Sequence, residues 1–189
     1  MSASDVAAAL EEARPGSPGL KALAEARRHV GLRESPAGSN RTPFGRWFGA
    51  DGVPWCAIFV SYCFNVGAGV VLGGGGSSGD GPGCNALGCA YVPTLRAWLE
   101  ETGQLGQAPP RPGDIAIFDW DGGQPDHTGI VERSLGEGRF VTIEGNTGIG
   151  NDTNGGEVMR RQRRLAAVDC FGRIRARRAG EEADDPGYT

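Results

Sequence analysis

Histidine is scarce in this chain: His29 and His127 are the only two among 189 residues. A structural zinc site takes four ligands, mostly cysteine and histidine. Cys84 and Cys89 enclose a short loop, but two further ligands for a metal beside them are hard to find. We therefore expect no metal site and no cofactor. The two cysteines form either a local disulfide or a pair of free thiols.

Long apolar runs are also absent. No segment approaches the 18 consecutive apolar residues that indicate a membrane-spanning helix. The first ten residues include Asp5 and lack the basic start and apolar stretch of a secretion signal. We expect a protein that is made in the cytoplasm and has no membrane partner. Any action outside the cell then requires delivery by another route than a signal peptide.

Neither sign of charge is in large excess, because the formal net charge is −4. This charge gives no general case for nucleic-acid binding, and no base-reading motif is present, so nucleic acid is not an expected partner. Eight arginines are nevertheless concentrated between Arg160 and Arg178. They form either the solvated face of a basic strand or a patch for an anionic polymer.

Glycine is abundant, with 33 residues, and it dominates segment 67–90. No Gly-Lys-Ser/Thr sequence follows these glycines, which excludes a phosphate-binding loop of that type. The segment is therefore either a cover over a cleft or a loosely packed insertion.

The apolar pattern predicts helices in the first half of the chain and strands in the second. Helical periodicity is followed by short apolar runs of period two, and that order is typical of an α+β fold in which helices pack on an antiparallel sheet. The predicted helices are 17–32, 54–66 and 93–102, and the predicted strands are 115–118, 129–133 and 139–144, with 158–164 and 168–175 as further candidates. We divide the chain into a flexible N-terminal segment (1–16), one domain (17–178) and an acidic tail (179–189).

Cys56 stands where a turn leads into the second predicted helix. The start of a helix carries about half a positive charge and unpaired N–H groups, which favour the thiolate form of a cysteine. A cysteine in an apolar helix is more often a core residue than a nucleophile, so Cys56 alone decides nothing.

The partners that a cysteine nucleophile needs occur later in the chain. His127 stands at the head of a predicted strand, and Glu144 and Asn146 end the next one. If the hairpin turn is centred near Gly136, His127 and Glu144 lie almost opposite each other, so that the carboxylate can hold the imidazole N–H. Asn146 shares the face of Glu144 and can support His127 or the reaction intermediate.

Four motifs make the chain resemble one family, the CHAP domain (cysteine, histidine-dependent amidohydrolase/peptidase) family. The resemblance runs in order from about residue 22 to about residue 173. The motifs are Pro54-Trp55-Cys56-Ala57, Gly113-Asp114-Ile115-Ala116-Ile117-Phe118, Asp126-His127-Thr128-Gly129-Ile130-Val131 and Ile143-Glu144-Gly145-Asn146.

This resemblance implies a papain-like α+β fold and cleavage of an amide bond in bacterial peptidoglycan. We expect the protein to be a monomer. It assigns the nucleophile to Cys56, the base to His127, the orienting acid to Glu144 and an accompanying role to Asn146. The reaction is that of an N-acetylmuramoyl-L-alanine amidase or of an endopeptidase for the stem or cross-bridge peptide. Holin-type release, virion delivery or non-classical export would bring the enzyme to the wall.

Two other functions stay open. One is a cysteine amidase for a small intracellular γ-glutamyl or polyamine conjugate, and the other is a catalytically silent binding module that uses the same cleft. Trp55 and Trp120 either wall that cleft and bind substrate or pack in the core. The run from Asp119 to Gly123 is similar to the start of a calcium loop, but Ile130 stands where glutamate would be needed, so we interpret it as a turn.

Overall fold

The computed structural model of the protein describes residues 16–74 and 83–175. The acidic tail 179–189 and all but the last residue of the N-terminal segment 1–16 lie outside the described residues. Residues 75–82, within the glycine-rich segment, lie outside them as well.

The helices lie before the main sheet in the chain, as the apolar pattern predicts. The first one begins after Ser17, whose hydroxyl accepts the N–H of Leu20, and Pro18 occupies its first turn. It ends at Arg28, four residues before the predicted end. The helices are α2 (Pro18–Arg28), α3 (Pro43–Phe48), α4 (Cys56–Ala68) and α5 (Val92–Glu101).

The main sheet has six antiparallel strands in the order β3-β8-β4-β5-β6-β7. β5 begins at His127 and is longer at both ends than the strand predicted over 129–133, so His127 belongs to the sheet itself. The six strands are β3 (Leu105–Gly106), β4 (Ile115–Phe118), β5 (His127–Gly136), β6 (Arg139–Thr147), β7 (Glu157–Arg164) and β8 (Val168–Gly172). A separate hairpin pairs β1 (Cys84–Asn85) with β2 (Gly88–Cys89).

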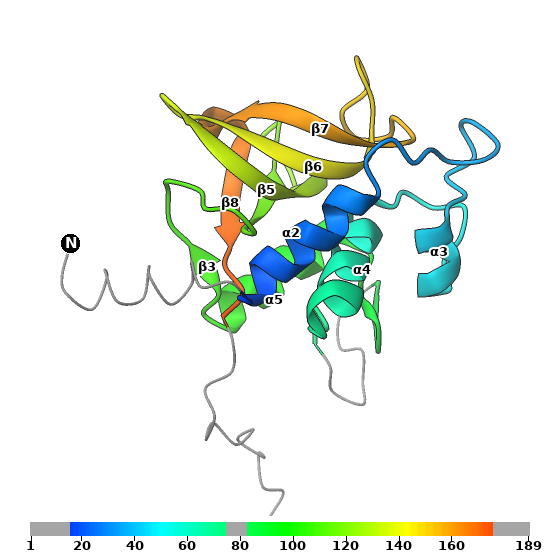
Figure 1. Ribbon diagram of the computed structural model, residues 1–189, viewed down its shortest axis with the longest axis horizontal. Coiled ribbons are helices and arrows are strands. Elements are labelled where there is room, and N and C mark those ends of the chain that lie inside the picture. The colour runs from blue at the N-terminus through cyan, green and yellow to red at the C-terminus, as the bar shows by residue number, and fades with distance from the viewer. Residues whose placement is uncertain (1–15, 75–82, 176–189) are drawn as a thin grey trace, which may run out of the picture.

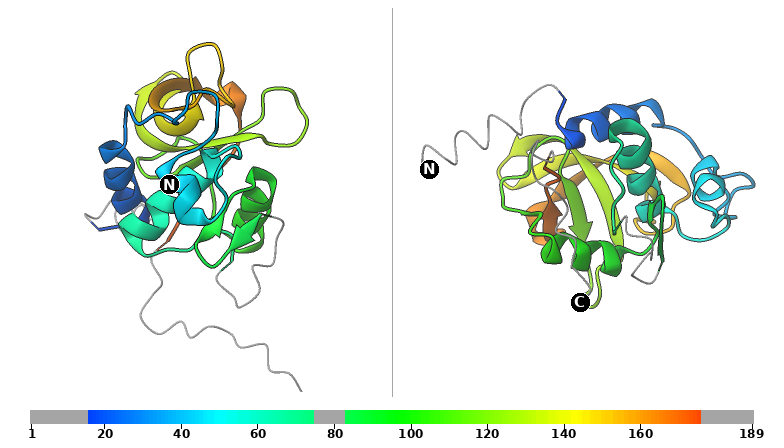
Figure 2. Two further views of the ribbon diagram at one scale, coloured as in Figure 1. Left: turned by 90° about the vertical axis from the view of Figure 1, so that its right-hand side faces the viewer. Right: turned by 90° about the horizontal axis from the view of Figure 1, so that it is seen from below.

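The helices cover one face of this sheet. Figures 1 and 2 show α2 and α4 side by side, and both helices contact β5 and β6. The main core lies in this layer, where Ile115, Ile117 and Ile130 pack under the helices. A smaller cluster around Phe118 and Phe140 covers the opposite face. The arrangement confirms the predicted α+β fold, with helices on an antiparallel sheet.

Within the described residues, no helix is both long and apolar enough to cross a membrane.

Candidate active site

Cys56 is the first residue of α4. Trp55 occupies the cap position and makes no side-chain cap hydrogen bond, so no side chain occupies the N–H groups of the first turn from there. These groups have no acceptor within the helix and carry partial positive charge. They are therefore available beside the sulfur to bind negative charge that develops on a substrate.

A close approach at Gly145 seats the start of α4 on the sheet. A Cβ atom at Gly145 would stand 2.7 Å from Cβ of Phe59 and 2.8 Å from Cζ3 of Trp55. Only a residue without a side chain fits there, because real Cβ atoms do not tolerate such distances. The first turn of α4 thus rests directly on β6, beside Glu144, and this contact brings Cys56 to the site.

His127 is fully buried at the first position of β5, where it pairs with Phe118 of β4. Its Nε2 lies 3.0 Å from Oε2 of Glu144. Its Nδ1 makes no hydrogen bond of standard geometry with any described residue. Nδ1 is therefore the ring nitrogen left to interact with Cys56.

The register between β5 and β6 differs from the prediction by two residues. Pairing His127 with Glu144 would place Val141 opposite Ile130, whereas the structure pairs Ile130 with Ile143. Gly136 pairs with Arg139, so the turn lies two residues further along the chain than its predicted centre, which alone would shift the pairing by four residues. One extra residue of β5 at each of two irregularities, between Val131 and Arg133 and after Ser134, reduces this shift to two. A two-residue shift keeps every side chain on its face, so Glu144 still reaches the imidazole, as a diagonal neighbour rather than a direct partner.

The pKa of the His127 imidazole depends on both Cys56 and Glu144. Burial alone would lower the pKa of His127, because it disfavours the imidazolium. Cys56 and then Glu144 act in the opposite direction, through hydrogen bonding and charge, and raise this pKa to about 9. The thiol and the ring thus interact electrostatically, although they lie outside standard hydrogen-bond geometry. Catalytic hydrogen bonds are often loose before substrate binds.

Glu144 is fully buried and is held by three side chains. Arg163 donates two hydrogen bonds to it, from Nε to Oε1 at 2.8 Å and from Nη2 to Oε2 at 2.6 Å. The Thr142 hydroxyl donates to Oε1, and His127 contacts Oε2. Burial would raise the pKa of Glu144, but Arg163 and then His127 lower it to about 2. Glu144 is therefore an anion at any pH where the protein is expected to work.

Asn146 lies next to this cluster but points elsewhere. Its backbone has a φ of 55°, in the left-handed region, and its amide donates to the carbonyl of Thr153 at 3.1 Å. Its Oδ1 is buried and makes no hydrogen bond with any described residue. The structure therefore brings Cys56, His127 and Glu144 together and shows Asn146 anchoring the loop that follows β6. A supporting role of Asn146 toward His127 stays a prediction.

The two tryptophans occupy different environments. Trp55 is fully buried and stacks on Phe44, so of its two possible roles the structure shows core packing. Trp120 is 38% exposed and lies over the imidazole, with 5.6 Å between the ring centroids of Trp120 and His127. Trp120 is thus placed to meet a substrate, whereas Trp55 is not.

The site is less open than the groove that a bulky substrate suggests. Cys56 keeps 4% of its surface exposed, and neither His127 nor Glu144 keeps any. The enclosure follows from the packing, because α4 lies directly on β5 and β6 and the Trp120 ring covers the imidazole.

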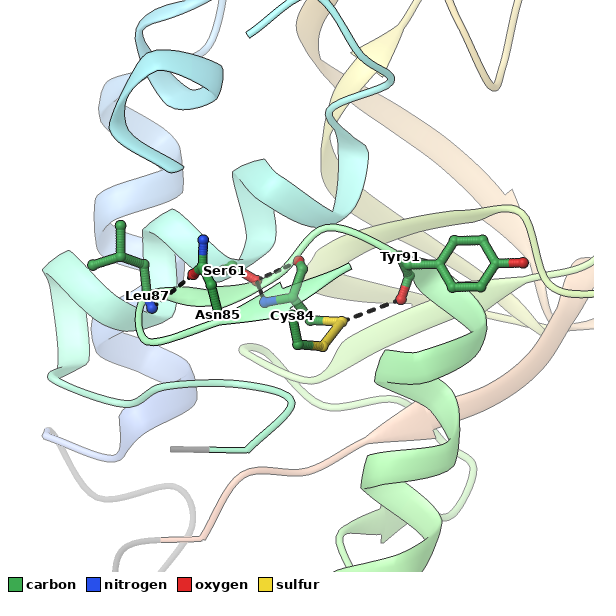
Figure 3. Close-up of a disulfide and its surroundings, with 6 residues drawn as sticks. Ser61, Cys84, Asn85, Leu87 and Tyr91 are labelled. Atoms are coloured by element: carbon green, nitrogen blue, oxygen red, sulfur yellow. Dashed lines mark hydrogen bonds between the residues drawn. A yellow bond between two sulfur atoms is a disulfide. The ribbon is translucent and has the colours of Figure 1, made fainter. Parts of the chain in front are cut away.

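Cys84 and Cys89 form a disulfide, which decides between the two alternatives that the sequence leaves open. The bond closes the β1–β2 hairpin, and Figure 3 shows how Ser61 of α4 ties this hairpin to the helix. The Ser61 hydroxyl donates to the carbonyl of Cys89 at 2.8 Å and accepts its N–H at 2.9 Å.

The segment after β4 is a turn stabilised by its own carboxylates. Asp119 Oδ1 accepts the N–H groups of Asp121 and Gly122, and Asp121 Oδ1 accepts the N–H of Gly123. Across the described residues, no cluster of three or more cysteine, histidine or carboxylate side chains has the geometry to hold a metal ion.

Sequence reasoning missed Arg163 and Gly129. Arg163 belongs to the basic run, which was open to interpretation as a solvated face or a patch, yet it is only 8% exposed and binds Glu144. Gly129 lies within the His127 motif without any signal of its own role. Alternation along β7 does not indicate Arg163, because Val158 and Arg163 are five residues apart and lie on opposite faces of the strand.

Comparison with known proteins finds two similar solved structures and one matching family. Two crystal structures of Ly7917, the second with the hydrolyzing product of MDP, align with 82% and 81% of this chain. The identities are 18% and 19%, the TM-scores are 0.46 and 0.49, and this chain spans about three fifths of that protein (62% and 61%). Comparison with curated proteins gives no significant match. The family model of the CHAP domain matches residues 48–146, more than half of the chain and a segment that includes Cys56, His127 and Glu144, and the chain therefore belongs to the CHAP domain family.

Proposed function

We propose that this protein is a cysteine hydrolase that cleaves an amide bond in bacterial peptidoglycan. The observation that carries the proposal is the line of three side chains formed by Cys56, His127 and Glu144, at the point where the start of α4 meets β5 and β6. A nucleophile, a base and an orienting carboxylate in this order are the parts that acyl transfer requires. Membership of the CHAP domain family supports the same chemistry.

In the proposed reaction the Cys56 thiolate attacks the carbonyl carbon of the scissile amide. The N–H groups at the start of α4 bind the oxygen as it becomes negatively charged. His127, protonated through its raised pKa of about 9, gives its Nδ1 proton to the leaving amine as the C–N bond breaks. The neutral imidazole then takes a proton from water, the hydroxide attacks the thioester, and the sulfur leaves as thiolate.

Glu144 acts on this cycle through His127. Its Oε2 accepts the Nε2 proton and thereby fixes the ring so that Nδ1 faces the sulfur. Its negative charge stabilises the imidazolium form that must exist before the amine leaves. The carboxylate itself stays ionised throughout, in agreement with its pKa of about 2.

Digestion of purified peptidoglycan tests the proposal. We expect the wild-type protein to release soluble fragments and Cys56→Ala to release none. Cys170→Ala is the matched control, because Cys170 is a free cysteine on β8, outside the site. Masses of peptides freed from intact glycan would identify an N-acetylmuramoyl-L-alanine amidase, and masses of shortened peptides would identify an endopeptidase. Fragment release by folded Cys56→Ala would contradict the proposal.

The small exposure of Cys56 favours a second candidate, an amidase for a small γ-glutamyl or polyamine conjugate. A thiol with 4% of its surface exposed admits a narrow acyl chain more readily than a cross-linked polymer. Comparing the two substrates distinguishes the two candidate functions. Turnover of soluble γ-glutamyl amides without any release from peptidoglycan would select the second function, and the reverse result would select the first.

A further inference from the structure

Arg163 lies behind the proposed catalytic residues, on β7, outside the segment that the family model matches. Its guanidinium holds both oxygens of Glu144, with Nε on Oε1 at 2.8 Å and Nη2 on Oε2 at 2.6 Å. Two parallel hydrogen bonds of this kind fix the plane and the position of a carboxylate, which a single contact does not do. Oε2 is the same atom that contacts Nε2 of His127.

The third nitrogen of Arg163 is also engaged. Nη1 donates to Oδ1 of Asp152 at 2.8 Å, and the neighbouring Arg161 donates to the same oxygen. Asp152 belongs to the loop between β6 and β7. The guanidinium is therefore held at both ends, by a buried carboxylate at the site and by a partly exposed one in this loop.

Aromatic rings fix Arg163 from the remaining side. Its Cζ lies 5.3 Å from the ring centre of Phe118 and 5.1 Å from that of Trp120. The same two rings stand beside His127, at 6.0 Å and 5.6 Å between centroids. Arg163 and His127 thus share one aromatic wall while they bind the same carboxylate.

We propose that Arg163 is a positioning residue, which keeps Glu144 ionised and immobile so that Oε2 stays on Nε2 of His127. Within the described residues Arg163 makes no hydrogen bond to Cys56 or His127, so its action on the base passes through Glu144. The inference rests on the proposed function only where it concerns turnover.

Other titratable groups also face this pair. Cys56 of α4 and Asp126 ahead of β5 interact with His127, and Asp152 faces Arg163. Among these groups Arg163 is the permanent cation next to Glu144. It is also the strongest of the influences that lower the pKa of Glu144 against burial. Removal of Arg163 must therefore raise the pKa of Glu144, while the other groups remain.

Arg163→Met is the decisive variant, because methionine keeps much of the length and loses the charge. Arg160→Met is its matched control. Arg160 lies on the same strand and holds another buried carboxylate, Glu132, through Nε at 2.9 Å and Nη2 at 3.2 Å. Both substitutions remove a two-pronged arginine from a buried glutamate, and only the first touches the site.

The first measurement needs no substrate. The imidazole NMR signals of His127 shift at acid pH as Glu144 takes up a proton. We expect the midpoint of this shift to lie at least about one pH unit higher in Arg163→Met than in wild type. His29 gives the only other imidazole signals and serves as an internal reference. Arg160→Met should leave the His127 titration unchanged. An identical His127 titration in Arg163→Met and wild type would overturn the proposal, even if peptidoglycan proved not to be the substrate.

The second measurement uses turnover. We expect kcat/KM of Arg163→Met to fall by about 100-fold, because a displaced carboxylate misaligns the base, and the acid limb of its pH profile to move upward. Arg163→Lys keeps the charge and loses the two-pronged contact, so its kcat/KM should fall less. This variant replaces Arg163→Met in the experiment if Arg163→Met does not fold. Losses of equal size in Arg163→Met and Arg160→Met, with unshifted pH profiles, would reduce Arg163 to a structural role.

Discussion

Gly129 lies beneath the side chain of Glu144. A Cβ atom at Gly129 would stand 2.4 Å from Cγ of Glu144 and 3.4 Å from its Cβ. The missing side chain leaves the space through which Glu144 extends along the sheet toward His127. The diagonal contact between Glu144 and His127 thus depends on a residue that takes no part in the chemistry.

Gly129→Ala should therefore impair turnover more than stability. The added methyl group must push Glu144 aside, since the backbone at Ile143 leaves no room in the other direction. We expect a loss of about 1–3 kcal/mol of folding free energy and a fall of about 100-fold in kcat/KM. Denaturant unfolding and initial rates on the same preparations would measure both quantities.

Gly172→Ala is the control for this experiment. A Cβ atom there would stand 2.6 Å from a methyl group of Leu99, so the substitution also overpacks a strand glycine, but it does so in the helix layer away from the site. Similar losses of kcat/KM in the two variants would show that overpacking, and not displacement of Glu144, explains the effect.

The His127 pKa should depend on Cys56. Cys56 has the larger effect of the two groups that raise the pKa of His127 to about 9, against the effect of burial. Cys56→Ala removes the sulfur, so the His127 pKa should fall, and the signals of His29 serve as the internal reference. Titration of the imidazole signals by NMR measures this directly. An unchanged value in folded Cys56→Ala would mean that the thiol and the ring do not interact in solution.

Stability should be greatest in mildly acidic solution. The pKa of His127 is raised from 6.5 to about 9, so its contribution is full below pH 6.5 and is lost as the pH rises through about 9. The pKa of Glu144 is lowered from 4.5 to about 2, so its contribution is full above pH 4.5 and is lost as the pH falls through about 2. Each contribution is on the order of a few kcal/mol, and the two overlap because the residues pair with each other.

Urea unfolding at a series of pH values would test this expectation. His127→Gln should flatten the decline between pH 6.5 and 9. Loss of solvent contact raises the pKa values of Cys63, which is buried, and of Cys170, which is partly buried beside Asp169, and both add to the loss only as the pH rises above 9. If the free energy of unfolding of His127→Gln declines between pH 6.5 and 9 as much as that of wild type, other groups cause the decline.

The sequence was sufficient to locate the three candidate catalytic residues because each stands at the end of a recognisable element. Cys56 begins an apolar helix, His127 begins β5, and Glu144 ends the strand predicted over 139–144, although β6 continues to Thr147. The register between those strands was predicted two residues off, because the turn lies at Glu137-Gly138, later than its predicted centre, and the irregularities in β5, which leave no mark in the apolar pattern, compensate for only half of that displacement.

Arg163 could not be found in the same way. It stands in a run of arginines, most of which are exposed or half-exposed, and only the three-dimensional pairing shows which one is buried on a carboxylate. The orientation of the Asn146 side chain could not be predicted either, since the left-handed backbone of Asn146 turns it toward Thr153. Buried charge pairs and positive φ angles depend on distant partners, which local sequence patterns do not encode.

The β1–β2 hairpin should affect stability and leave catalysis intact. Reduction of the Cys84–Cys89 disulfide releases a six-residue loop, for which chain entropy predicts a loss of about 2 kcal/mol. Ser61→Ala should cost a similar amount, about 1–3 kcal/mol, because it leaves the buried N–H and carbonyl of Cys89 without their partner. Denaturant unfolding with and without reductant measures both losses.

Turnover should survive both changes, because Ser61 holds the hairpin to the middle of α4, whereas Cys56 stands at its start and is seated by Gly145. We expect rates within about twofold of wild type at a temperature where every form remains folded, which circular dichroism verifies. Combining Ser61→Ala with reduction should cost less than the sum of the separate losses, since both act on the same hairpin. A large loss of turnover in the reduced, folded protein would instead place the hairpin in the substrate-binding surface.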